Sequence, residues 1–238
     1  MSVIQARQLN FQLDTFEDLY ASSTSTNMIK MMDILNQIDA VISSNLSESY
    51  VLLPPQILLR FIEKSMLLSE TRHLAEQHLS LLCQLTQPSG VCEIKAHILW
   101  GQLLADKAND DKFLFAQKTK VLSKAINHLS IAQKMIQQPH HSGKYDFLTY
   151  NLSRTIYRIL RVHFRSGYLS SFANLAEQII RALTDSTDSE YDWKGLFNWL
   201  FLYCLRDAGR AKDFDDELTK LWATSRKKTF TFQESLFR

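Results

Sequence analysis

Apolar residues recur along the chain at helical spacing, most clearly between Trp193 and Trp222. In the first part of this stretch one helix face is apolar at positions i, i+3, i+4, i+7 and i+11: Trp193, Leu196, Phe197, Leu200 and Cys204. Trp199 and Leu202 lie off this face, so we expect the helix to be covered on more than one side.

A turn at Asp207-Ala208-Gly209-Arg210 is predicted to end this helix, with Gly209 in the left-handed conformation that glycine adopts at little cost. A second, antiparallel helix follows at once. Its expected core positions are Phe214, Leu218, Leu221 and Trp222. The stretch is therefore predicted to be a helical hairpin, which is the unit of an α-solenoid.

The same pattern predicts further hairpins along the chain. They begin near Pro54, Val91, Tyr145 and Trp193, a spacing of about 35 to 55 residues and broader than the ~34 of regular tetratricopeptide repeats. The third hairpin pairs residues 145–165 with residues 168–183 and turns at Gly167. We therefore predict an all-α fold: an α-solenoid of about four degenerate tetratricopeptide-like hairpins over residues 50–228.

Both ends of the chain depart from this pattern. Residues 1–49 predict helices that are loosely attached or cap the array, with Thr15 and Asp18 spaced as a capping box. Residues 229–238 begin a further helix with a second such spacing, Thr231 and Glu234. A helix of under two turns is not stable alone. The chain is thus expected to belong to something longer, or to dock its open end on a partner.

Composition supports the helical prediction. The 238 residues are 45% hydrophobic, and six glycines and four prolines leave little turn material for many short strands. The net charge of +2 favours neither nucleic acid nor an anionic membrane as a partner. Three cysteines, no signal-peptide pattern and no apolar run of roughly 18 residues predict a soluble, cytoplasmic protein.

No motif for catalysis or cofactor binding stands out. The glycines are scattered, so neither a phosphate loop nor a dinucleotide fingerprint is present, and no GxSxG nucleophile elbow occurs. Cys83, Cys92 and His97 lack a second CxxC, and His73 and His78 point to different sides of one helix. We expect no enzyme, cofactor or metal site, although a dispersed catalytic triad would leave no such motif.

One basic ridge exceeds this background. Arg154, Arg158, Arg161 and Arg165 fall within about 60° of each other on one helix, opposite an apolar face. Guanidinium groups pair with carboxylates in bidentate geometry, so the ridge suits acidic peptide tails or the carboxylates of another protein. The alternative is a solvated face with local partners. The basic run at residues 226–228 is typical of a helix C-terminus, and the aromatic residues from Trp193 to Tyr203 are expected in the core.

An ordered set of motifs between Lys144 and Arg210 resembles a known family. The motifs are an aromatic stretch at Tyr145, Phe147, Leu148, Tyr150 and Asn151, the Gly167-Tyr168 turn, an acidic loop from Asp185 to Trp193, and the turn Ala208-Gly209-Arg210. Their order and spacing are similar to the N-terminal region of the cilia- and flagella-associated protein forty-six family over roughly residues 50–238. That family consists of very large axonemal proteins, far longer than this chain.

The resemblance implies a non-enzymatic scaffold of the motile cilium. Its members belong to the d projection of the first central-pair microtubule and help to control ciliary beating through contacts with other large axonemal proteins, with tubulin a further candidate partner. It implies no catalytic residues. The competing hypothesis is a cytosolic adaptor whose hairpins bind a peptide or helix of a partner protein.

Overall fold

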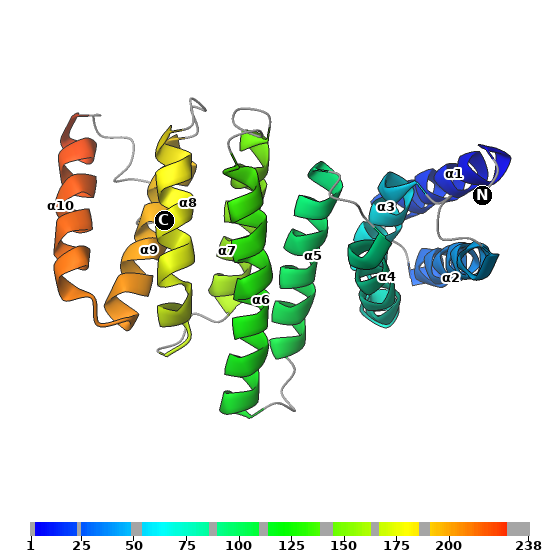
Figure 1. Cartoon of the computed structure of the whole chain (residues 1–238), viewed down its shortest axis with the longest axis horizontal. Coiled ribbons are helices and arrows are strands. Elements are labelled where there is room, and N and C mark those ends of the chain that lie inside the picture. The colour runs from blue at the N-terminus through cyan, green and yellow to red at the C-terminus, as the bar shows by residue number, and fades with distance from the viewer. Residues whose placement is uncertain are drawn as a thin grey trace. The chain divides into compact units, whose positions relative to one another are not determined.

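A computed structural model describes residues 3–22, 25–48, 54–85, 90–109, 114–138, 145–162, 167–185 and 191–227. Within these ranges every regular element is a helix and no strand occurs (Figure 1). The all-α prediction is therefore confirmed for this part of the chain. The chain forms two compact units, Met1–Leu103 and Leu104–Arg238, and each is described by itself.

The first unit contains four α-helices, a 3-10 turn and most of α5. Their bounds are α1 Val3–Ala21, α2 Ser25–Glu48, α3 Pro55–Ser65, the 3-10 helix η1 Ser69–Thr71, α4 Arg72–Leu85 and α5 Val91–Ala108. Pro55 lies in the first turn of α3, where its missing N–H would have no helical partner. Thr71 is buried and donates its hydroxyl to the carbonyl of Ser65 at 2.9 Å, which closes the turn between α3 and α4.

One apolar core joins the helices of this unit. Its largest fully buried side chains include Phe16 of α1, Leu35 and Ile38 of α2, and Phe61 of α3. Exposing a fully buried side chain of this kind to water costs roughly 1.5–3 kcal/mol. Burial of these side chains therefore stabilises the packing of α1 and α2 in the unit. Helices α1 and α2, which lie in the region predicted to be loosely attached or capping, share this core with α3 and α4.

The N-terminal capping box is wrong. Thr15 lies in the interior of α1, and its hydroxyl donates to the carbonyl of Phe11 at 2.9 Å, a bond within the helix. Phe11, also on α1, is 71% exposed. Leu9, Leu13 and Phe16 form the buried face of α1, with Ala6 and Leu19 partly buried against the same core.

The second unit contains the C-terminal end of α5 and the remaining helices. These are α6 Phe115–Ile136, α7 Asp146–Val162, the 3-10 helix η3 Leu169–Phe172, α8 Ala173–Asp185, α9 Tyr191–Asp207 and α10 Ala211–Lys227. Helix α7 contacts α6, α8 and α9, and α9 lies between α8 and α10 (Figure 1). The second helix of the third hairpin, predicted as one segment from Tyr168, instead begins with η3.

Helix α9 is the inner helix that its apolar pattern predicted. Phe197, Leu200 and Cys204 are buried, and so are Phe201 and Leu202 from outside that face. Neighbours α8 and α10 cover these two sides. Helix α10 differs from the prediction at all four expected core positions, since Phe214, Leu218 and Leu221 are only half-buried and Trp222 is 58% exposed.

Both predicted glycine turns are present. Gly167 has φ +92° and Gly209 has φ +67°, values that favour glycine over residues with a side chain. After α9, the amide of Arg210 donates to the carbonyl of Leu205 at 3.0 Å and the amide of Gly209 to that of Arg206 at 3.1 Å. This bond pair is the Schellman motif, which satisfies carbonyls at the helix end and starts α10 at once.

Candidate partner-binding site on α7 and α9

Helix α7 has one apolar and one basic face, as its sequence predicted. Leu152, Ile156 and Leu160 are fully buried, and Ile159 is 5% exposed. Arg154, Arg158 and Arg161 are exposed on the opposite side. The fourth predicted member of the ridge, Arg165, lies outside the described residues. The basic ridge is hereafter the set Arg154, Arg158 and Arg161.

Trp193, on the first helix of the next hairpin, lies against α7 beside the basic ridge. Its indole Nε1–H donates to the hydroxyl of Ser153 at 2.8 Å. The buried Ser153 in turn donates to the carbonyl of Tyr150 at 2.7 Å, so its hydroxyl is both donor and acceptor. These bonds fix the indole ring on α7, at a distance of 40 residues along the chain.

Aromatic rings surround Trp193 on the α7 side. The ring centroids of Tyr150 and Tyr157 lie 5.9 and 5.4 Å from that of Trp193, both at edge-on angles. The guanidinium carbon of Arg154 lies 5.4 Å from the Tyr150 centroid and 5.8 Å from the Trp193 centroid. Both distances are within the range of cation–π attraction, which favours one position of the Arg154 side chain.

A depression of about 530 Å³ opens at this point. Its lining residues are Asn151, Arg154, Thr155, Tyr157, Arg158 and Trp193. It therefore combines two guanidinium groups, a side-chain amide and aromatic rings, contributed by two successive hairpins. Such a lining can bind an anionic group through the guanidinium donors and cover adjacent apolar atoms with the rings.

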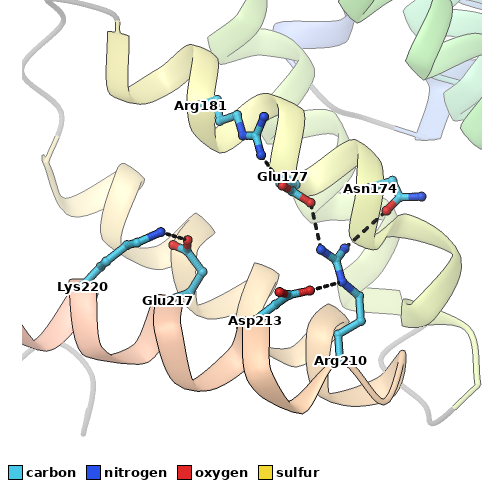
Figure 2. Close-up of polar contacts among 7 residues, drawn as sticks. All are labelled: Asn174, Glu177, Arg181, Arg210, Asp213, Glu217 and Lys220. Atoms are coloured by element: carbon cyan, nitrogen blue, oxygen red, sulfur yellow. Dashed lines mark hydrogen bonds and ion pairs between the residues drawn. The ribbon is translucent and has the colours of Figure 1, made fainter.

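The charges of the basic ridge are not neutralised by any described residue. None of its three arginines forms an ion pair with a carboxylate in the part of the chain that the structure describes. The pattern at Arg210 is different, because its Nε lies 2.6 Å from Asp213 and its Nη2 3.2 Å from Glu177 (Figure 2). The hydrogen bonds that Arg210 donates, first to Asp213 and then to Glu177, raise its pKa.

Arg181 also bonds to Glu177, on the same helix, and Arg210 reaches Asn174 at 3.3 Å (Figure 2). Arginines at the α8–α10 contact are thus used internally, which stabilises the position of α10. The arginines of the basic ridge form no ion pair with a described carboxylate. The ridge is therefore the stronger candidate for binding a partner.

The other candidate chemistry remains dispersed. Cys204 is fully buried, and burial, with the nearby Asp207 carboxylate, raises the pKa of its thiol to about 12. Burial also raises the pKa of Cys92 and lowers that of His97. His73 is exposed whereas His78 is buried, so the two do not converge. Among the described residues, no three His, Cys, Asp or Glu side chains are arranged to hold a metal ion.

Sequence reasoning found the arginines of the site but assigned Trp193 to the core. Trp193 and Trp199 are instead half-buried and Tyr203 is exposed, whereas Phe197 and Phe201 are buried as predicted. The sequence pattern that could have indicated this site is on α7. There Tyr150, Arg154 and Tyr157 are spaced at i, i+4 and i+7 and so share one helix face.

Comparison with known proteins places the chain in no family. No protein-family model matches it, and no curated protein matches its sequence significantly. None of the described helices has the length and apolar character needed to cross a lipid bilayer.

Proposed function

We propose that this protein is a non-enzymatic scaffold that binds another protein through the basic ridge of α7 and the adjoining Trp193. The observation that carries this proposal is the exposure of three arginines that pair with no described carboxylate. Guanidinium groups that pair with no described carboxylate and lie beside a depression can bind a partner's carboxylates in bidentate geometry.

The scaffold is proposed to be an α-solenoid of degenerate tetratricopeptide-like hairpins. The order of contacts in the second unit supports this architecture, since α7, α8, α9 and α10 each contact the next helix. The Trp193 contact also links the first helices of two successive hairpins. Stacked hairpins of this kind present continuous surfaces to partners.

The resemblance to the cilia- and flagella-associated protein forty-six family supplies a cellular setting for the proposal. On this basis the protein is a component of the axonemal central-pair apparatus that supports ciliary beating. Its partners are then other large axonemal scaffold proteins, with tubulin as the acidic candidate. Localisation of a tagged chain in a ciliated cell tests this setting: signal along the central pair supports it, and diffuse cytosolic signal contradicts it.

The binding role is tested by charge reversal. Arg154, Arg158 and Arg161 are changed together to Glu, and recovery of partners from an axonemal extract and co-sedimentation with microtubules are compared with the unchanged chain. We expect both to fall while the helical circular dichroism spectrum is kept, because all three side chains are exposed. Unchanged recovery in both assays would refute a binding role for the ridge.

A cytosolic peptide-binding adaptor is the second candidate function. The depression at Trp193 favours it, since a single peptide segment could occupy a hollow of about 530 Å³. The localisation experiment separates the two: the adaptor predicts ridge-dependent binding without axonemal localisation.

A further inference from the structure

We infer that the depression formed by α7 and Trp193 is an anchoring site for an extended acidic peptide segment, whose carboxylates lie along Arg154, Arg158 and Arg161. The inference rests on the proposed function and adds the chemistry of the ligand. It identifies a specific site, with Trp193 as the aromatic wall and Arg154 as its oriented guanidinium group.

The spacing of the ridge favours several carboxylates over one anion. At a rise of 1.5 Å per residue, Arg154 and Arg158 are about 6 Å apart along the helix axis, and Arg161 lies about 4.5 Å further on. A single phosphate could engage neighbouring guanidinium groups, but it could not span the whole set. Acidic side chains in sequence along an extended segment recur every few ångströms and can meet all three.

Arg154 is held ready for such a ligand. Its guanidinium lies over two rings, and Trp193, the second of these, is itself fixed by the hydrogen bond to Ser153. The planar group can thus receive a carboxylate with less loss of side-chain freedom than a freely rotating arginine. Asn151 adds an amide to the same lining.

The arrangement is less suited to nucleic acid. Stacking of bases needs open ring faces, whereas Trp193 makes T-shaped contacts with Tyr150 and Tyr157 and has the guanidinium of Arg154 over its ring. The chain as a whole has 25 acidic residues against 27 basic ones, so no strong general field attracts a polyanion. An acidic protein segment is the ligand that the local charges favour.

The test is a titration of the full chain with a short fluorescein-labelled peptide of alternating glutamate and serine, read by fluorescence anisotropy. The double variant Arg154→Gln/Arg158→Gln should raise the dissociation constant about tenfold or more, the loss expected for charge-assisted hydrogen bonds. Affinity should also fall as salt is raised. The matched control is Lys120→Gln/Lys124→Gln, which removes two exposed positive charges at the same spacing from α6 and should change binding little.

Trp193 provides a second readout. Peptide binding should change the intrinsic fluorescence of the unchanged chain, and this change should be absent in Trp193→Phe, because the other three tryptophans lie outside the site. Trp193→Leu should weaken peptide binding, since Arg154 then lacks one of its rings.

The inference would be overturned by any of the following results: no saturable binding, equal binding of an analogue with glutamine in place of glutamate, or ridge-dependent binding of a single-stranded oligonucleotide that is tighter than that of the peptide. Inorganic phosphate that displaces the peptide at equal concentration would also contradict it. If the charge-reversed chain loses its partners while this peptide does not bind, the proposed function stands and the ligand assignment fails.

Discussion

The carboxylate of Asp207, at the end of α9, accepts hydrogen bonds from the backbone amide of Gly167 at 2.8 and 3.0 Å. It also accepts one from the amide of Ser170 at 2.9 Å. These amides lie at the start of η3, where a helical N–H has no partner within its own helix. A residue of the fourth hairpin thus caps the turn of the third.

Replacing Asp207 should therefore destabilise the second unit. Asp207→Ala leaves both amides without this acceptor and should lower the free energy of unfolding by about 1–3 kcal/mol, and Asp207→Asn by less, since one acceptor oxygen remains. Urea unfolding followed by circular dichroism measures the loss. Asp215→Ala on α10, an exposed position, serves as the control and should be close to neutral. Equal losses at the two positions would contradict the capping role.

Gly209 allows a test of backbone conformation alone. A Cβ atom at this position would meet no atom within 4 Å, so the cost of a side chain comes from φ +67° and not from collision. Gly209→Ala should lower the free energy of unfolding by about 1 kcal/mol, and Gly209→Val by more because its side chain is β-branched. Gly209→Asn should be the mildest change. If thermal melting is the same for all three, the turn assignment is wrong.

The contact between Arg210 and Glu177 should give a small, salt-dependent coupling. Arg210 is one-third exposed, and for such pairs a double-mutant cycle with Arg210→Gln and Glu177→Gln is expected to give about 0.5 kcal/mol. The coupling should decrease as sodium chloride is added. A parallel cycle on Glu217 and Lys220, within α10, is the control for an ion pair that does not link two helices. A coupling no larger than in that control would mean that the contact does not hold α10.

His78 depends on Asp39 for its buried hydrogen bond. The His78 side chain is 1% exposed and its Nε2 lies 2.6 Å from the Asp39 carboxylate, across from α4 to α2. Asp39→Ala leaves that buried nitrogen unpaired and should destabilise the first unit by about 1–3 kcal/mol. Asp33→Ala, at an exposed site on the same helix, controls for the change in helix propensity. A similar urea midpoint for the two variants would rule out a stabilising role.

Glu17 should make a small part of the stability dependent on pH. Hydrogen bonds from Lys64 first and then Arg60 lower the pKa of Glu17 below its usual value of 4.5. A group with a lowered folded-state pKa contributes stability above its unfolded-state pKa and loses it as the pH falls through the folded-state value. Glu17→Gln should therefore reduce the urea midpoint slightly at neutral pH and converge with the unchanged chain in acid.

Periodicity was sufficient for the helical class and for most buried faces, because each face is set by local spacing. On α7, the helical spacing of Arg154 and Arg158, opposite Leu152 and Ile156, predicted both the exposed and the buried side. The same reasoning failed at Tyr203 and Trp222, two aromatic residues that were expected in the core and are exposed. Hydrophobic character alone does not show whether a neighbouring helix is present.

The candidate site was less predictable because it depends on contacts between hairpins. The arginines lie on one helix and could be found by spacing, whereas the bond between Trp193 and Ser153 joins residues 40 positions apart. Asp207 and Gly167 are likewise separated by 40 positions. Helix spacing carries no information about such pairs, which depend on how successive hairpins pack.

The hydrogen bond from Trp193 to Ser153 would couple the binding of a ligand at the proposed site to folding. A ligand that contacts both Trp193 and Arg154 finds its complete site only while the third and fourth hairpins are docked. By mass action, every bound molecule then removes undocked chains from the equilibrium, and the apparent stability of the hairpin pair rises with ligand concentration. A partner bound at this surface would therefore also stabilise the docking of the third and fourth hairpins.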